Sequence, residues 1–117
     1  MTYIDGFVLP VPISHKERYL EHARECVPVF KKYGALRCVE NWGVDVPDGE
    51  VTSFPLAVQK KDDEIVMFSW IVWPSKEARD KGMEGAMQDP FFQSDEEFTI
   101  FDGKRMIIGG FETILDE

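Results

Sequence analysis

The chain has 117 residues, of which 44% are hydrophobic and 13% aromatic. We expect a single globular domain over residues 1–117, because two halves would each be too small to bury a stable core. Lysine and arginine number 13 against 22 aspartates and glutamates, which gives a net charge of −9. A surface this acidic repels phosphate backbones, so nucleic acid is not an expected partner.

The sequence has no run of about 18 apolar residues that would predict a membrane span. It also lacks the basic, apolar and small-residue order of a secretion signal, so we expect a cytoplasmic protein with no membrane partner. The two cysteines, Cys26 and Cys38, are too few for a disulfide scaffold, and a reducing cytosol disfavours a bond between them. No cysteine or histidine spacing predicts a metal site. Phosphate-binding glycine loops and serine-nucleophile motifs are also missing, so no cofactor is expected.

The N-terminal segment predicts a strand followed by a helix. Residues 3–11 mix aromatic and β-branched side chains and predict the first strand. Ser14 and Glu17 have the spacing of a capping box, which predicts that the helix begins there. Apolar residues at helical spacing continue to Gly34, and we expect Pro28 to bend the helix or to mark a boundary in it.

Three further strands are predicted in the middle of the chain. Residues 36–42 alternate between apolar and polar side chains, and residues 51–59 read as the return strand. Pro55 would confine that return strand to an edge or a bulge. Residues 64–73 are too apolar for a strand with one face in water, so we expect both faces of this strand to be covered.

The C-terminal third predicts a second helix and a last strand. Ser75 can cap this helix, and close packing against another backbone is the expected reason for Gly82 and Gly85 inside it. The acidic segment 95–102 is expected to be irregular, solvated surface. Residues 104–114 predict the last strand, with its two adjacent glycines as a bulge.

This order of elements predicts an α+β fold, namely a ferredoxin-like split βαβ domain with an antiparallel sheet and both helices on one face. Two helices cannot cover both faces of the sheet. The apolar central strand therefore predicts a second cover, which we expect to be another copy of the chain. The predicted assembly is a homodimer packed sheet to sheet.

Several motifs in order resemble the YbaA-like family of small bacterial proteins. They are Tyr-Ile-Asp-Gly-Phe-Val at 3–8, Asp-Val-Pro-Asp-Gly at 45–49 with Thr-Ser-Phe-Pro at 52–55, Phe-Ser-Trp-Ile-Val at 68–72, and Phe-Asp-Gly-Lys-Arg-Met at 101–106 before Gly-Gly-Phe at 109–111. The resemblance runs nearly end to end and implies a dimeric α+β barrel. It implies no activity, because that family has no established reaction to carry over.

Two carboxylates fall on predicted apolar strand faces and are the candidate catalytic residues. Asp5 shares a face with Tyr3 and Phe7, and Glu40 shares one with Cys38. A desolvated carboxylate has a raised pKa and can act as a general base. The alternative is that each carboxylate lies near a strand end in water or forms an ordinary salt bridge across the dimer.

The candidate ligand-binding residues are Ser69, Trp70, Asp102 and Arg105. Trp70 and its aromatic neighbours suit either the wall of an apolar pocket, with Ser69 as a small polar anchor, or packing in the core and dimer. Arg105 could offer a guanidinium to an anion, whereas Asp102 and the following glycine are also typical of a turn. His15 and His22 are expected on the surface, because their spacing of seven is not that of a paired metal site.

The leading hypothesis is a protein that binds a small, largely apolar molecule as a homodimer. A cofactor-independent enzyme of monooxygenase or isomerase type, with Glu40 or Asp5 as its base, is the first alternative. A structural or protein-interaction dimer is the second alternative.

Overall fold

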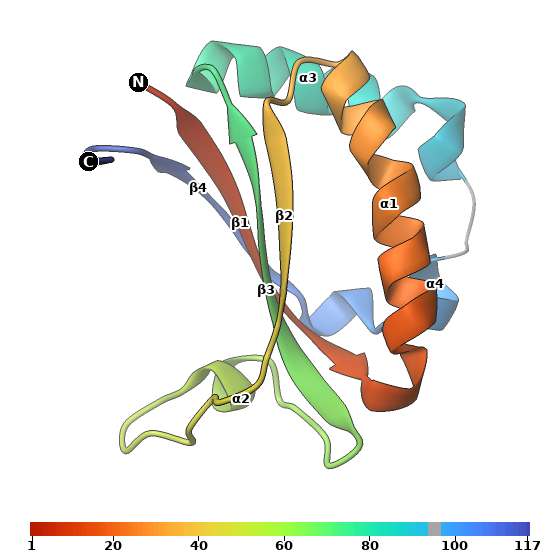
Figure 1. Ribbon diagram of the computed structural model, residues 1–117, viewed down its shortest axis with the longest axis vertical. Helices are drawn as coiled ribbons and strands as arrows, with labels where there is room; N and C mark the ends of the chain where they lie inside the picture. Colours follow the sequence, from red (N-terminus) through yellow and green to blue (C-terminus); the bar gives the residue numbers. More distant parts are fainter. Residues whose placement is uncertain (94–96) are drawn as a thin grey trace.

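The computed structural model describes residues 1–93 and 97–117, apart from the side chains of residues 97 and 98. Four antiparallel strands form one sheet in the order β2-β3-β1-β4 (Figure 1). Their bounds are β1 Tyr3–Pro12, β2 Arg37–Trp42, β3 Glu64–Trp73 and β4 Ile107–Glu112. The two long apolar strands, β1 and β3, occupy the centre, where each pairs on both edges.

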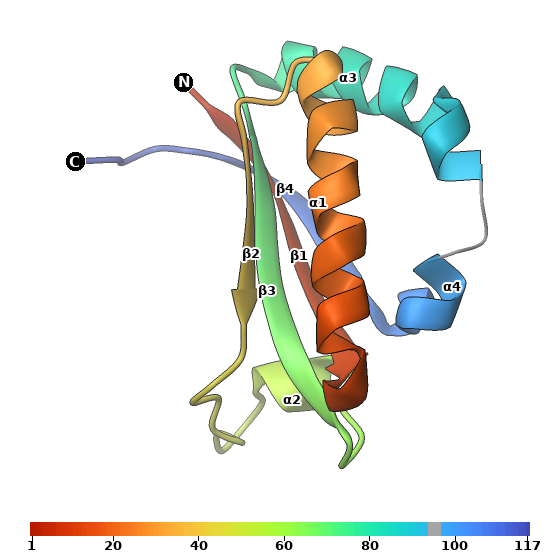
Figure 2. The ribbon, with the colours of Figure 1, turned by 45° about the vertical axis from the view of Figure 1, so that its right-hand side comes forward.

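The two long helices, α1 (Lys16–Lys32) and α3 (Lys76–Gln88), lie on the same side of the sheet (Figures 1 and 2). The short elements are α2 Phe54–Ala57, α4 Glu97–Ile100 and the 3-10 turns η1 Ile13–His15, η2 Pro90–Gln93 and η3 Gly103–Arg105. The strand-helix-strand-strand-helix-strand order confirms the predicted ferredoxin-like α+β class. No helix in the described part of the chain is long and apolar enough to cross a bilayer.

The predicted capping box at the start of α1 is wrong. Ser14 lies inside η1, and the residue before the helix is His15, whose side chain makes no capping hydrogen bond. The extended backbone of Pro12 leads directly into this 3-10 turn, and the amide of Lys16 donates to the carbonyl of Ile13. The turn thus satisfies backbone groups that a cap would otherwise serve. Pro28 lies within α1, which runs through it.

The predicted strand over residues 51–59 is also wrong. This region contains the short helix α2, whose Ser53 hydroxyl accepts a 3.1 Å hydrogen bond from the amide of Leu56. Pro55 occupies the first turn, where a missing amide hydrogen costs no helical bond. Local capping chemistry therefore overrides the weak strand pattern, and β2 and β3 are joined by a long connection instead of a tight hairpin.

The structure confirms that Ser75 caps α3 and that close packing explains the glycines in this helix. The Ser75 hydroxyl accepts a 3.1 Å hydrogen bond from the amide of Ala78. A Cβ atom at Gly82 would lie 2.6 Å from the carbonyl oxygen of Tyr33 and against the Trp73 ring, and one at Gly85 would lie 2.6 Å from the Tyr33 ring. The missing side chains allow α3 to pack closely on the end of α1 and on the sheet.

The last strand is shorter than predicted and contains no bulge. Residues 103–105 form η3, and Gly109 and Gly110 pair in continuous register with Gly6 and Asp5. The glycines have a steric cause, because a Cβ atom at Gly110 would collide with the Tyr3 hydroxyl. Asp95 and Glu96 of the predicted acidic segment lie outside the described residues.

The two faces of the sheet have different surroundings. The helix-facing side carries the core, including Leu9, Met67, Ile71 and the fully buried Trp73. The other side, which we call the open face, has no long helix over it (Figures 1 and 2). The short helix α2 lies over one end, where the Phe54 ring is 6.0 Å from the Phe68 ring. By strand alternation it carries the apolar side chains of Ile4, Val8, Val39, Phe68, Trp70, Val72, Ile107 and Phe111. Phe68 is 45% exposed and Phe111 is 62% exposed, so this face is a large apolar surface.

Candidate functional site

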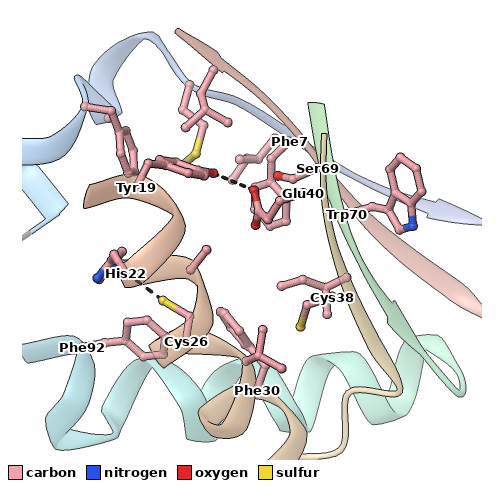
Figure 3. A pocket seen from close by; sticks show the side chains of 18 of the residues that line it. Phe7, Tyr19, His22, Cys26, Phe30, Cys38, Glu40, Ser69, Trp70 and Phe92 are labelled. Atoms are coloured by element: carbon pink, nitrogen blue, oxygen red, sulfur yellow. Dashed lines mark hydrogen bonds between the residues drawn. The ribbon is translucent and has the colours of Figure 1, made fainter. Parts of the chain in front are cut away.

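A cavity of about 570 Å³ lies between α1, α3 and the helix-facing side of the sheet (Figure 3). Helix α1 supplies one wall and strands β1, β2 and β3 supply the opposite one. Residues 92 and 101–108 border a further side, and the cavity is open to solvent. Apolar, aromatic and sulfur-containing side chains dominate the lining: Phe7, Leu9, Tyr19, Ala23, Cys26, Val27, Phe30, Cys38, Ile71, Met83, Met87, Phe92, Phe101, Met106 and Ile108.

The polar centre of the cavity is Glu40, which β2 presents toward α1. The Tyr19 hydroxyl donates a 2.7 Å hydrogen bond to Glu40 Oε1, and Ser69 lies directly opposite Glu40 on β3 (Figure 3). Glu40 is the one carboxylate among the described lining residues. A carboxylate accepts up to about four hydrogen bonds, so Glu40 keeps acceptor capacity for a molecule in the cavity.

The surroundings of Glu40 raise the pKa values of three side chains, Glu40, Tyr19 and Cys38. Glu40 is exposed on one side, yet the side chains around it desolvate its carboxylate and raise its pKa above the usual value, and the hydrogen bonds from Tyr19 and Ser69 oppose this shift in part. Burial and the adjacent Glu40 charge raise the pKa of Tyr19, so its hydroxyl stays protonated and remains a donor. Burial and Glu40 also raise the pKa of the Cys38 thiol. A ligand would therefore meet a neutral tyrosine and a carboxylate that accepts a proton more readily than one in water.

Asp5, the other predicted catalytic carboxylate, does not reach this cavity. It is buried at the far end of the sheet, where Trp73 Nε1 donates a 2.9 Å hydrogen bond to it and Arg79 lies 3.7 Å away. Burial raises the pKa of Asp5, and the Arg79 charge opposes that effect. These contacts make Asp5 part of a buried ion pair within one chain, and not the solvated carboxylate or the salt bridge across the dimer of the alternative interpretation.

The four predicted ligand-binding residues separate into three groups. Ser69 is buried beside Glu40 in the cavity. Trp70 borders the cavity, but its ring points away toward the open face, 5.3 Å from the Phe68 ring (Figure 3). Alternation along β3 is the reason, because neighbours on a strand face opposite sides.

Asp102 and Arg105 lie outside the cavity and do not form an anion site. Arg105 donates 2.8 and 2.6 Å hydrogen bonds to the two oxygens of Glu64 and a 3.0 Å bond to Asp102. The guanidinium also donates to the carbonyl of Gln59. The sequence could not indicate this function of Arg105, because Glu64 is 41 residues away at the start of β3.

The surface positions predicted for the two histidines are wrong. His15 is half-buried, with Nδ1 2.7 Å from the carbonyl oxygen of Ile100, and His22 lines the cavity. Sequence reasoning also missed Tyr19 as a site residue. A tyrosine on the apolar stripe of a helix needs a partner for its hydroxyl, and that requirement was the available signal. Within the described residues, no three histidine, cysteine, aspartate or glutamate side chains lie close enough to hold a metal ion.

Comparisons with known proteins agree with the fold and with the resemblance. The fold is similar to a dimeric ferredoxin-like protein from an uncultured marine organism, with a TM-score of 0.65, 10% identity and full coverage of both chains. It is also similar to SnoaB, a cofactor-independent oxygenase from Streptomyces nogalater, with a TM-score of 0.62, 14% identity and coverage of 98% and 95% of the two chains.

The sequence is 53% identical to the uncharacterized protein YbaA of Escherichia coli K12 over 117 residues, which is the full length of both chains. Residues 2–103 match the profile of DUF1428, described as a protein of unknown function. The chain therefore belongs to the DUF1428 family and is a full-length relative of YbaA.

Proposed function

We propose that this protein binds a small, largely apolar molecule in the cavity between α1, α3 and the sheet. The cavity itself carries the proposal, because its volume of about 570 Å³ is within the range of about 300–1,000 Å³ typical of ligand pockets. Its walls suit an apolar body, and the Glu40 carboxylate suits one hydrogen-bond donor on the ligand. The favoured ligand is thus an apolar ring or chain that carries a single hydroxyl or amine group.

The proposed working form is a cytoplasmic homodimer in which the open faces of two sheets pack together. The apolar side chains of that face, among them Phe68, Trp70 and Phe111, support this arrangement. The fold shared with a solved dimeric ferredoxin-like protein supports it as well.

Native mass spectrometry of protein purified gently from cells tests the assembly and the ligand together. The expected spectrum is a dimer that carries a reproducible small adduct. In the variant A23F, a phenyl ring enters the cavity from α1, and the adduct should disappear. The matched control E21F adds the same ring at an exposed position of α1 and should keep it.

A binding assay makes the proposal refutable when purification removes the natural ligand. N-phenyl-1-naphthylamine is neutral and apolar and has one N–H donor, and its fluorescence rises when it enters an apolar site. The wild type and E21F should bind it, whereas A23F should not. Equal binding to A23F and E21F would refute the cavity as the binding site.

A second candidate function is cofactor-independent catalysis with Glu40 as the general base. The observation in its favour is the raised pKa of Glu40, which brings a carboxylate closer to the range where it exchanges protons at neutral pH. SnoaB, which shares the fold, is an oxygenase that works without a cofactor. For an isomerase, Glu40 would remove a proton from one ligand carbon and return it to another.

The variant E40Q separates catalysis from binding, because glutamine keeps the shape of the side chain and cannot accept the proton. If Glu40 is a base, E40Q should bind the ligand found by mass spectrometry and fail to convert it. Conversion at the wild-type rate by E40Q would exclude this role.

A further inference from the structure

Cys26 and His22 form a pair on the α1 wall of the cavity, opposite Cys38. Cys26 Sγ lies 3.6 Å from His22 Nε2, within hydrogen-bond range for sulfur (Figure 3). The spacing of four residues places both side chains on one face of the helix. The imidazole stacks on Phe91 at an interplanar angle of 15°, which holds its orientation. Both residues line the cavity and are half-buried, so a bound molecule can reach the thiol.

The two cysteines of the cavity differ in what surrounds their sulfur atoms. Cys26 has an imidazole nitrogen that can accept the thiol proton, and a thiolate is the nucleophilic form of cysteine. Cys38 lies on β2 near Glu40, and burial and that carboxylate both favour its neutral thiol. The cavity therefore contains one thiol in contact with an imidazole and one thiol whose neighbouring carboxylate favours the neutral form.

We propose that Cys26, with His22 as its base, is a nucleophile that captures apolar α,β-unsaturated carbonyl compounds in the cavity. This inference rests on the proposed function and narrows the ligand class to electrophilic enals and enones. The chemistry balances within the two partners. The sulfur forms a bond to the β carbon as the carbon–carbon π bond breaks, and the thiol proton passes through His22 Nε2 to the α carbon.

The cavity favours this class of electrophile for two reasons. Its apolar walls concentrate neutral, apolar molecules next to the thiol. Conjugate addition also needs no oxidant or second substrate, because the thiol supplies both atoms that are added. An ordinary cysteine is a few per cent thiolate at neutral pH, so proton acceptance by His22 can raise the rate by about ten- to thirtyfold.

The test uses the full-length protein and trans-2-nonenal, with adduct formation followed by intact mass and peptide mapping. Nonanal serves as a matched control because it has the same chain length without the reactive double bond. The variants are C26S, C38S and H22F. Phenylalanine keeps an aromatic ring against Phe91 and lacks the nitrogen. Urea unfolding of each variant shows which of them remain folded.

The expected result is one adduct per chain on Cys26, which is absent in C26S and unchanged in C38S. Its rate should fall about tenfold or more in H22F if the imidazole is the base. Labelling of Cys38 at a similar rate, or an unchanged rate in folded H22F, would overturn the inference.

Binding of N-phenyl-1-naphthylamine, measured on the same samples, distinguishes this inference from the function on which it rests. Naphthylamine binding without an adduct on Cys26 rejects the reactive thiol and leaves the binding function standing. Failure of both measurements rejects the cavity as a ligand site, and the inference fails with it.

Discussion

The substitution Gly82→Ala tests whether close packing of α3 determines the shape of the cavity. A Cβ atom there would lie 2.6 Å from the Tyr33 carbonyl oxygen and 2.8 Å from Trp73 Cη2, and it would collide with a second atom of that ring. Trp73 is 0% exposed, so its ring has no free space into which it can move. Overpacking of this kind costs about 1–3 kcal/mol, and we expect the upper part of that range because one obstacle is backbone.

Alanine also favours a helix over glycine by about 1 kcal/mol, which offsets part of the overpacking cost. The expected net change for G82A is therefore a destabilisation of about 1–2 kcal/mol. Because α3 carries Met83 and Met87 into the cavity, its displacement should also weaken ligand binding.

Urea unfolding followed by circular dichroism measures this change as a shift of the midpoint at constant slope. The control is Gly85→Ala, whose Cβ atom would contact only the half-buried ring of Tyr33. A ring can tilt where a carbonyl cannot, so G85A should lose less stability than G82A. If G82A equals or exceeds the wild type in stability, close packing is not the reason for this glycine.

Three further predictions concern charge and assembly. The variant R105M leaves Glu64 buried without its partner and should lose about 3–5 kcal/mol at pH 7, much of which E64Q in the same chain should restore. Arg105 lowers the pKa of Glu64, so this stability is present above the unfolded value of 4.5 and disappears as the pH falls. Urea unfolding at pH 7 and pH 3 checks both statements, and an equal loss at the two pH values would contradict them. The pH effect of Glu40 is the opposite: because its pKa is raised in the folded protein, the protein loses stability as the pH rises above 4.5. The variant E40Q should therefore have a higher melting temperature than the wild type at pH 8 and the same one at pH 4. A wild-type melting temperature for E40Q at pH 8 would show that the carboxylate is not desolvated. Phe68→Lys places a charge on the open face and should convert dimers to monomers in sedimentation velocity, whereas Glu21→Lys on the outer side of α1 should not. Dimers in F68K would mean that this face is not the interface.

The fold class could be predicted because it depends on patterns that are local in sequence. The run of apolar residues in β3 predicted a central strand, and Ser75 predicted the start of α3. The wrong predictions concern two segments in which two local backbone conformations compete. At Ser14 a 3-10 turn replaced the cap, and around Pro55 a one-turn helix replaced a strand. Both segments are connections, where no buried stripe selects one conformation.

The site was only partly predictable, for a physical reason. Strand alternation placed Glu40 on an apolar face with Cys38, and both residues line the cavity. Its partner Tyr19 comes from a different element, and only the packing angle of α1 on the sheet brings the two groups together. Arg105 was assigned to a ligand because its charge is visible in the sequence and its contact with Glu64 is not. Sequence patterns thus indicate which face a residue occupies, and tertiary packing decides what it meets.

The pairing of β1 with β4 has a consequence for the order in which the protein folds. This pairing joins Tyr3 to Glu112, so it closes nearly the entire chain into one loop. Contacts between distant residues cost the most chain entropy and slow folding, so we expect β4 to dock last. Ile108 on β4 and Met106 just before it form one side of the cavity. A newly made chain would therefore acquire its binding site only at the final step of folding, and a ligand would select the molecules that have completed it.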